Sequence, residues 1–270
     1  MSTILIKFGG EVANTLDQFN NLIHSIEVLH QQKDKIVIVH GGGPQATDLS
    51  TKLNLTPRFV GGRRITDAET LEVMKMTLAG VINSDILAKF RSRALPGAAV
   101  SGITVVMAKK RPPKAVSGSN GEVIDFGLVG DILEIDTGVI ELLINNNFIP
   151  VISPLSCDSQ GLILNINADT VAVAIARKLR VDKFIFITSV GGVFQDISNK
   201  NSRFTTLSVS QAKEKIKNGV IQGGMIPKLE ESFSLLEDGL GSFHIVGVDS
   251  PDGLSREINR PGTVGTALIK

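Results

Sequence analysis

The sequence predicts an α/β fold built on a mainly parallel sheet. Short apolar runs rich in β-branched residues alternate along the chain with longer amphipathic segments, which is the pattern of βαβ units. The apolar runs are nearly continuous, as expected for parallel strands that helices cover on both faces. With 270 residues, the chain is long enough for one large α/β unit or for two domains.

Six segments have the length and composition of buried strands, and seven have helical periodicity. The predicted strands cover residues 4–8, 36–40, 102–107, 148–152, 184–188 and 243–248. The predicted helices cover residues 16–31, 45–53, 67–95, 138–145, 169–179, 210–218 and 225–239. Capping boxes are expected at the start of two helices, with Thr66 and Glu69 in one and Ser208 and Gln211 in the other.

Residues 108–126 interrupt this alternation. The segment is basic, contains Pro112 and Pro113, and carries a Ser/Gly/Asn run at 117–121 that predicts a turn between two short strands. We expect an exposed β-hairpin here, with its basic residues either in solvent or over a substrate. A cluster of turn residues at 154–161 marks the expected boundary between two lobes.

Composition excludes several classes of protein. Cys157 is the single cysteine, so an internal disulfide cannot form and a zinc cluster is not expected. The 28 Lys and Arg residues balance 27 Asp and Glu residues, so no basic field attracts nucleic acid or a membrane surface. No apolar run is long enough for a signal core or a membrane span. We expect a cytoplasmic protein that binds neither nucleic acid nor membrane and holds no metal on its own side chains.

Glycine-rich loops follow the first two predicted strands. Lys7 comes near the end of the first strand and precedes Gly9 and Gly10, whereas the second strand runs into a triple glycine at 41–43 and then Pro44. Ligands bind beyond the carboxyl ends of parallel strands, and unhindered amides at a helix start can bind an anion. The alternative for Lys7 is a strand-end lysine that reaches solvent beside an ordinary glycine turn. His40 is expected to be a packed strand-end histidine in preference to a ligand.

The second half of the chain contains similar features. Asn165, Asn167 and Asp169 precede a helix, the loop after strand 184–188 is rich in small residues, and Lys228 lies in the first turn of a helix that follows two glycines. A lysine there opposes the helix dipole, which a bound anion would explain. The simpler alternatives are that Asp169 caps its helix and that Lys228 is a tolerated surface lysine.

Two lysines, two glycine-rich loops and one aspartate suit phosphoryl transfer, which requires mainly positioning and charge neutralisation. A nicotinamide-dependent oxidoreductase is the rival interpretation, because Gly41, Gly43 and Ala46 fit a relaxed dinucleotide-binding fingerprint. Against it, Pro44 removes an amide from the middle of the loop. No acidic residue ends the next predicted strand at the expected spacing of about 20 residues.

Five motifs, at residues 7–10, 39–44, 64–67, 165–169 and 224–228, occur in the order found in the amino acid kinase family, which this chain resembles from Lys7 to Gly265. The resemblance implies an open three-layer αβα sandwich with two lobes. Residues 1–157 would bind an acyl amino acid and form a dimer, and residues 158–270 would bind ATP. The implied reaction transfers the γ-phosphate of ATP to the γ-carboxylate of N-acetyl-L-glutamate, a step of arginine biosynthesis.

The resemblance also implies roles for individual residues. Lys7 and Lys228 would stabilise the transferring phosphoryl group, and Asp169 would orient both lysines. The implied acyl amino acid site consists of Gly10, Gly42, Gly43, Arg64 and Asn165. The implied nucleotide site consists of Ser189, Val190, Gly191, Gly192, Val193, Phe194, Val220, Ile221 and Gln222. Magnesium would be held by the ATP phosphates and not by protein side chains.

Two departures from the family pattern keep alternatives open. Ser189 stands where the family usually has aspartate, which leaves a catalytically silent nucleotide-binding regulator as one alternative. Arg63 adds a cation beside Arg64, so the acceptor can also be a related acyl amino acid, such as N-succinyl-glutamate or an aminoadipate derivative. The resemblance further implies a homodimer formed through the helix that begins at Asp67.

Overall fold

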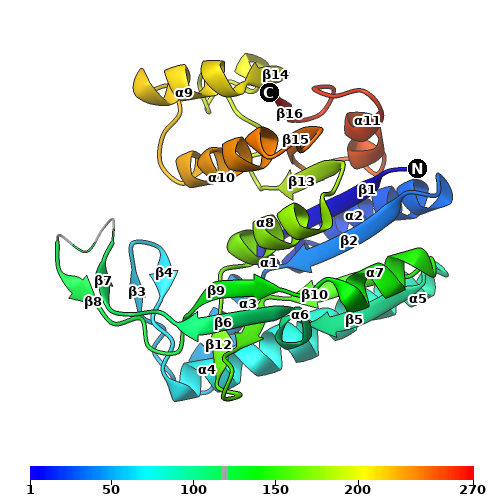
Figure 1. Cartoon of the computed structure of the whole chain (residues 1–270). Coiled ribbons are helices and arrows are strands. Elements are labelled where there is room, and N and C mark those ends of the chain that lie inside the picture. Colours follow the sequence, from blue (N-terminus) through cyan, green and yellow to red (C-terminus); the bar gives the residue numbers. More distant parts are fainter. Residues whose placement is uncertain (117–118, 120) are drawn as a thin grey trace.

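An eight-stranded sheet forms the centre of the protein in the computed structural model, which describes residues 1–116, 119 and 121–270 (Figure 1). From edge to edge its strands are β14 (Thr206–Ser208), β16 (Thr266–Ile269), β15 (Ser242–Val246), β13 (Lys183–Ile187), β1 (Thr3–Phe8), β2 (Lys35–His40), β10 (Ile149–Ser153) and β5 (Gly97–Ser101). Neighbouring strands are parallel except β15 and β16. The predicted mainly parallel sheet is therefore confirmed.

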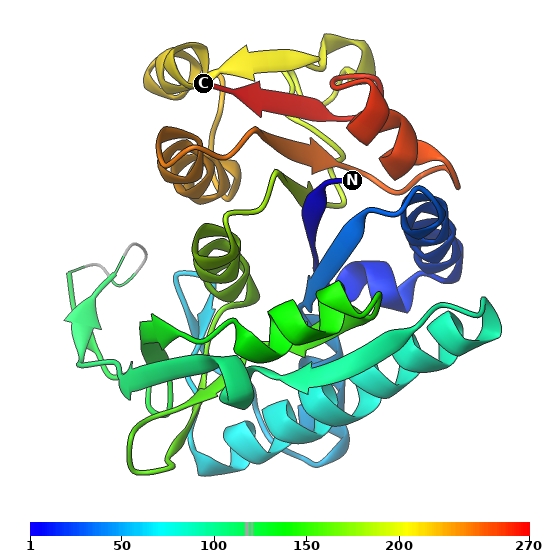
Figure 2. The same cartoon turned by 45° about the vertical axis from the view of Figure 1, so that its right-hand side comes forward.

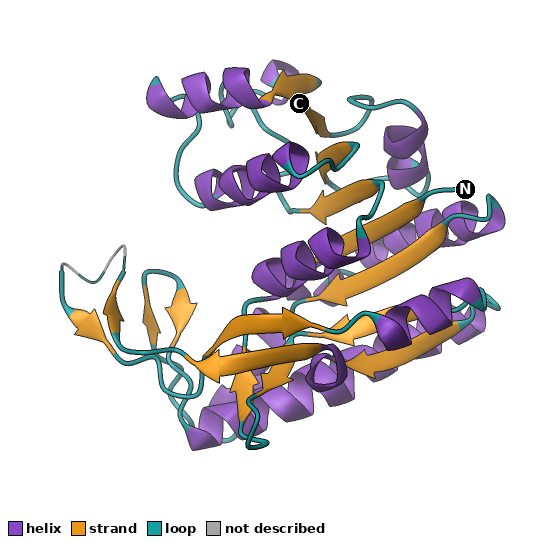
Figure 3. Cartoon of the chain, in the orientation of Figure 1, coloured by secondary structure: helices purple, strands orange, loops and turns teal. Residues whose placement is uncertain are grey.

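Helices cover both faces of this sheet, which gives the three layers of an αβα sandwich (Figure 3). One face carries α7 (Gly138–Asn145), α8 (Ala168–Leu179), α9 (Val209–Lys217) and α10 (Met225–Glu237). The other face carries α1 (Gly10–Asn14), α2 (Leu16–Gln31), α3 (Gly43–Lys52), the long helix made of α4 (Ala68–Lys75), η1 (Met76–Ile82) and α5 (Asn83–Ser92), and α11 (Gly253–Asn259). Side chains alternate between the two cores along β1, where Ile4 and Ile6 face one and Leu5 the other.

The predicted strand at 102–107 is wrong. The chain leaves β5 at Ser101, makes the single helical turn α6 (Gly102–Val105), and enters a second sheet of β12 (Ile163–Asn165), β11 (Leu155–Cys157), β6 (Val106–Lys110) and β9 (Gly130–Ile135). A Cβ atom at Gly102 would collide with the carbonyl oxygens of Ser153 and Leu155, so the turn fits only glycine. The apolar composition of residues 102–107 predicted a buried strand, but it could not show the turn at Gly102, where the backbone passes close to the carbonyl groups of Ser153 and Leu155.

Two small hairpins extend from the second sheet (Figures 1 and 2). They are β3 (Phe59–Val60) with β4 (Arg63–Arg64), and β7 (Lys114–Ala115) with β8 (Val123–Ile124). Backbone hydrogen bonds from Thr66 to Phe126 and from Leu128 to Thr66 join their bases. The hairpin predicted at 108–126 is thus confirmed only in its outer part, because residues 108–110 belong to β6. Positions 117, 118 and 120 of the predicted turn lie outside the described residues.

The long helix predicted at 67–95 ends earlier and changes type in its middle. Asp67 caps it, since Asp67 Oδ1 accepts from the Thr70 amide at 2.9 Å, so the capping box predicted around Thr66 is wrong. The central segment η1 is π-helical, a form common near functional sites. The second predicted capping box, between Ser208 and Gln211, is confirmed.

The connections of the sheet change direction beside β1. After β1 the chain passes to α2 on one face of the sheet, whereas after the neighbouring strand β13 it continues to α9 and α10 on the other face. In open α/β sheets, such a point at the carboxyl ends of the strands is where ligands bind. Within the described part of the chain, no helix is long and apolar enough to cross a membrane.

Candidate active site

Three charged side chains meet at the carboxyl end of β1. Lys7 Nζ lies 2.6 Å from Asp169 Oδ1, and Lys228 Nζ lies 3.3 Å from Asp169 Oδ2. Lys7 points to the face that carries α8 and α10, because Ile6 and Phe8 beside it point to the opposite face. Asp169 lies in the first turn of α8 and Lys228 lies in the first turn of α10, so three separate elements supply one cluster.

The cluster keeps its aspartate ionised. Burial by itself would raise the pKa of Asp169, but the charges of Lys7 and Lys228 outweigh it and hold that pKa below its usual range. Asp169 does not cap α8, because Asn167 performs that role and accepts from the Asp169 amide at 2.8 Å. The carboxylate is therefore free to bind the two ammonium groups, which rules out the simpler alternative for Asp169.

Glu231 is a fourth charged residue at this cluster, and the sequence analysis did not identify it. It lies on α10 three residues after Lys228, on the same side of the helix. Burial has the largest effect on Glu231, and the negative charge of Asp169 has the second largest. Together they raise the pKa of Glu231 to about 7, although the positive charges of Lys228 and Lys7 oppose the shift. The spacing from Lys228 was the one signal in the sequence that pointed to it.

The two glycine loops touch each other beside Lys7. The Gly41 amide donates to the Phe8 carbonyl at 2.8 Å, which joins the loop after β2 to the end of β1. A Cβ atom at Gly42 would run into Leu78 and Ile82 of η1, whereas one at Gly43 would meet nothing within 4 Å. The loop at residues 41–43 is thus packed closely on its inner side at Gly42 and is open at Gly43, as a ligand-binding loop requires. We call this loop the glycine cradle.

Arg64 lies against this cradle with one donor left over. Its Nη2 donates to the Gly43 carbonyl at 3.0 Å and to Thr47 Oγ1 at 2.8 Å, and its guanidinium carbon lies 4.6 Å from the centre of the Phe59 ring. Its Nη1 is buried and has no hydrogen-bond partner among the described residues. Burial lowers the pKa of Arg64, but a guanidinium remains charged at any physiological pH. An unsatisfied charged donor of this kind suits a carboxylate ligand.

Asn165 approaches the same region from the second sheet. Its Nδ2 donates to Thr66 Oγ1 at 3.2 Å, and Thr66 is fully buried two residues beyond Arg64. The hydrogen bond links the end of β12 to the chain just after β4. The structure therefore brings Asn165 close to the segment that contains Arg64, although the two bonded residues, Thr66 and Asn165, are 99 positions apart in the sequence.

The loop predicted to bind the nucleotide follows β13. The Gly191 amide donates to Thr188 Oγ1 at 3.1 Å, and the Val193 amide donates to Thr266 Oγ1 at 2.9 Å. Gly191 has a φ of +77°, a conformation that favours glycine. Among the predicted nucleotide-binding residues, Ser189, Val190 and Gln222 are exposed, Gly191, Phe194 and Val220 are half-buried, and Gly192, Val193 and Ile221 are buried.

His40 plays the packing role that was expected of it. The side chain is fully buried, and its Nε2 lies 3.1 Å from Asn83 Oδ1. Burial lowers the pKa of His40 to about 4, even though hydrogen bonds to Gly41 and Asn83 act in the opposite direction. The imidazole is therefore neutral at pH 7, and it supports the glycine loop from beneath.

Comparison with known proteins gives the family. Residues 2–247 match the model of the amino acid kinase family. The chain belongs to this family. An acetylglutamate kinase of Anaeromyxobacter sp. strain Fw109-5 is 40% identical over the full length of both chains. The acetylglutamate kinase of Methanocaldococcus jannaschii is 39% identical, with 98% of this chain and 90% of that protein covered.

Solved structures of other proteins have a similar fold. The smu.665 protein of Streptococcus mutans UA159 superposes with a TM-score of 0.77 at 28% identity, over 99% of this chain and 98% of that one. A carbamate kinase from Giardia superposes with a TM-score of 0.71 at 18% identity, over 100% and 99% of the two chains. At this lower identity, the second comparison concerns the amino acid kinase fold alone.

Proposed function

We propose that this protein is an acetylglutamate kinase, which transfers the γ-phosphate of ATP to the γ-carboxylate of N-acetyl-L-glutamate in arginine biosynthesis. The observation that carries the proposal is the Lys7–Asp169–Lys228 cluster at the carboxyl end of β1, beside the glycine cradle. Curated relatives that match the chain over its full length carry this activity in their names. The enzyme is an ATP-dependent phosphotransferase with a carboxyl group as acceptor.

The cluster supplies charge and does not supply a base. The acceptor carboxylate is ionised at neutral pH and can attack phosphorus without losing a proton to the protein. Lys7 and Lys228 neutralise the oxygens of the transferring group from two sides, which is the main task in phosphoryl transfer. Asp169 carries one negative charge against the two positive charges of Lys7 and Lys228. Glu231, with a pKa of about 7, is only partly ionised at neutral pH, so a net positive charge still faces the phosphate. Bound ATP supplies the phosphoryl group, with Mg²⁺ held on its phosphates.

The acceptor binds over residues 1–157 in this proposal. Arg64 Nη1 donates to the α-carboxylate, and the backbones of Gly10, Gly42 and Gly43 surround the acyl amino acid, with Asn165 contributing from the second sheet. The buried unpartnered Nη1 and the open space at Gly43 support this assignment. Residues 158–270 bind ATP, through the loop at 189–194 and the segment at 220–222.

The protein acts as a homodimer in the cytoplasm in this proposal. The outer side of the long helix exposes large apolar side chains, with Met76 at 47% and Val81 at 51% exposure. Apolar side chains clustered on one exposed helix face are typical of an interface. A second copy packed on this helix would cover both of them.

The test is an assay of the purified protein with ATP, Mg²⁺ and a panel of acceptors. ADP release reports turnover, and hydroxylamine traps an acyl phosphate product as its hydroxamate. We expect both signals with N-acetyl-L-glutamate, and neither with N-acetyl-L-aspartate or unacylated L-glutamate. A preference for N-succinyl-glutamate or an aminoadipate derivative would move the assignment to a related kinase. These acceptors are included because exposed Arg63 adds a positive charge beside Arg64. ATP binding without turnover on any acceptor would indicate the silent regulator.

A further inference from the structure

We propose that Phe186 is a positioning residue for both reactive lysines, and that its ring holds Lys7 and Lys228 by cation–π attraction where Asp169 joins them. The inference rests on the proposed kinase function and adds a residue to its site. Lys7 Nζ lies 4.6 Å from the centre of the Phe186 ring, and Lys228 Nζ lies 4.8 Å from it. Both distances are within the range of about 6 Å over which a ring attracts an ammonium group.

The sheet register produces this arrangement. β1 and β13 are parallel neighbours, and Lys7 is paired with Phe186 in their register. Paired residues on adjacent strands project to the same face, so the ring stands directly beside the lysine stem. Lys228 reaches the same ring from α10, which covers this face of the sheet. One aromatic side chain therefore contacts both ammonium groups, although they come from opposite ends of the sequence.

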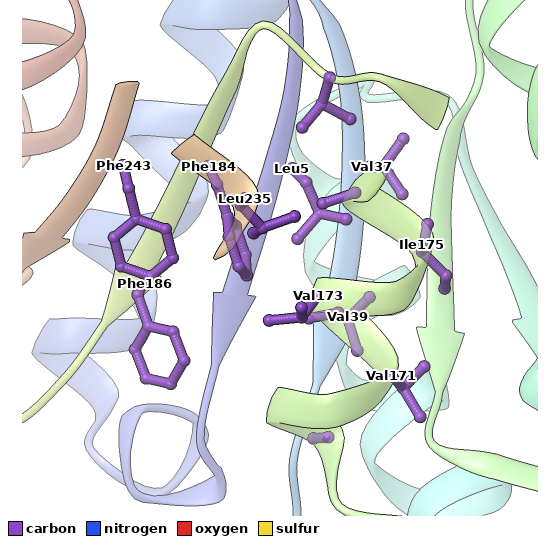
Figure 4. Close-up of a cluster of buried hydrophobic side chains, with 14 of the residues drawn as sticks. Leu5, Val37, Val39, Val171, Val173, Ile175, Phe184, Phe186, Leu235 and Phe243 are labelled. Carbon is purple, nitrogen blue, oxygen red and sulfur yellow. The ribbon is translucent and has the colours of Figure 1, made fainter. Parts of the chain in front are cut away.

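The Phe186 ring is shielded from water and is held by its neighbours. Phe186 is 1% exposed, so water screens its attraction for a cation very little. Phe243 on β15 stacks on it with a centroid distance of 6.1 Å, and Phe184 meets it edge-on at 6.2 Å. Figure 4 shows these three rings together in the core, on the side of the sheet that α8 covers. Because its neighbours fix the ring, the ring can in turn fix the lysines.

A phenylalanine suits this task better than another carboxylate. Lysine ammonium groups sit on flexible four-carbon stems, and they need a partner if they are to be placed before the substrate arrives. A second carboxylate paired directly with the lysines would place them, but it would cancel the positive charge that the phosphoryl group requires. Glu231, the other carboxyl group at the cluster, forms no ion pair with either lysine in the part of the chain that the structure describes, and its raised pKa keeps it partly protonated at neutral pH. An aromatic ring attracts cations and carries no net charge. Phe186 thus orders Lys7 and Lys228 and leaves their charge for the substrate.

The test weakens the cation–π attraction and leaves the shape of the ring nearly constant. Phe186 is replaced site-specifically by phenylalanines carrying one, two and three ring fluorines, which withdraw electrons progressively from the ring face. We expect log kcat to fall stepwise with the number of fluorines, by about tenfold in total at three, with the KM for the acceptor little changed. A residue with a purely packing role would not produce a graded response. Phe184 provides the matched control, because it lies in the same strand and core and, within the part of the chain that the structure describes, has no lysine ammonium over its ring.

A second measurement does not need activity. In protein labelled with ¹³C at the lysine ε carbon, the Lys7 and Lys228 signals should be displaced by the ring current of Phe186 and should return toward the usual lysine position in Phe186→Leu. Normal lysine signals in the wild type, or an equal loss of kcat in the Phe184 and Phe186 series, would overturn the inference. If no acceptor is phosphorylated but the lysine signals are displaced as expected, the kinase proposal fails and the positioning of the lysines stands.

Discussion

At the scale of residues, one buried carboxylate determines where two cations lie. Asp169 binds Lys7 and Lys228 through different oxygens, at 2.6 and 3.3 Å. Their charges in turn overcome the effect of burial and keep the Asp169 pKa low. The attraction between Asp169 and the two lysines holds all three side chains in place, so removal of one affects the rest.

Loss of either lysine should remove most of the turnover. We expect Lys7→Ala and Lys228→Ala each to lower kcat by about 10²–10³-fold, as is typical when one donor to a developing charge is removed. Lys213→Ala is the matched control, because Lys213 also pairs with a carboxylate, Glu237, and lies over a phenylalanine ring, but on the protein surface. Steady-state kinetics at saturating ATP and acceptor gives the answer. Turnover at the wild-type level in either lysine variant would contradict the two-lysine mechanism.

Glu231 should make the stability of the free protein depend on pH. Its pKa in the folded state, about 7, is higher than its usual value of 4.5. The folded state therefore binds this proton more tightly than the unfolded state, so the contribution to stability is complete below about pH 4.5 and disappears as the pH rises through 7. At pH 8 the folded protein carries an ionised, half-buried carboxylate beside Asp169.

Glu231→Gln removes this charge and should stabilise the protein only at high pH. We expect its free energy of unfolding to exceed that of the wild type by about 1–2 kcal/mol at pH 8, after allowance for solvent screening, and to equal it at pH 4. Urea denaturation at several pH values provides the measurement, with the exposed neighbour Glu230→Gln as the control. A difference between Glu231→Gln and wild type that stayed constant from pH 4 to pH 8 would refute the assignment.

At the scale of elements, the loop between β2 and α3 is shaped by the helix behind it. Gly42 packs against Leu78 and Ile82 of η1, the π-helical part of the long helix. His40 fills the space below and contacts Asn83 at the start of α5. The long helix thus supports the cradle from its central turns, so that the loop stays rigid although it contains three glycines.

The open side of this loop can be tested at Gly43. A methyl group there meets no protein atom within 4 Å, and Gly43 does not have a positive φ, so Gly43→Ala should unfold at the wild-type temperature. If the cradle holds the acceptor, the added methyl group should occupy its space and raise the acceptor KM by at least about tenfold, or about 1.4 kcal/mol. Gly80→Ala, at another open glycine outside the cradle, should leave that KM unchanged. An unaltered acceptor KM in Gly43→Ala would place the acceptor elsewhere.

At the scale of the whole molecule, the strand order places the glycine loop at 41–43 and the loop at 189–194 on either side of one strand. β1 lies between β2, which leads to the glycine cradle, and β13, which leads to the loop at 189–194. Lys7 on β1 therefore stands between the two sides. The phosphoryl group would cross from one side to the other over this residue.

The oligomeric state is a property of the whole molecule, and we expect a dimer. We expect a mass about twice the chain mass of 28.8 kDa in light scattering at micromolar concentration. Val81→Glu should convert the protein to a monomer, because it places a charge on the exposed apolar side of the long helix. Leu142→Glu, at a 63% exposed leucine of α7 on the opposite face of the sheet, should leave the dimer intact. A monomeric wild type would refute the dimer.

The sequence alone determined the elements whose pattern is local. β1, β2, β10, β13 and β15 follow from continuous apolar runs, and most long helices follow from their periodicity, because burial on both faces or on one face leaves a repeating signature. It also indicated Lys7 and the glycine loops, since a strand end followed by glycines is a local feature. The roles of Asp169, Lys228 and Arg64 were predicted from the family resemblance and still await the kinetic tests.

Tertiary structure decided whatever depends on contacts between distant residues. The strand predicted at 102–107 was wrong because the chain turns at Gly102, where the carbonyl groups of Ser153 and Leu155, some fifty residues away, leave no room for a side chain. Phe186 meets Lys7 only through the register of β1 with β13, and the pKa of Glu231 depends on Asp169 in another helix. Local sequence records the period and polarity of an element, but pair distances and pKa values depend on which elements pack together.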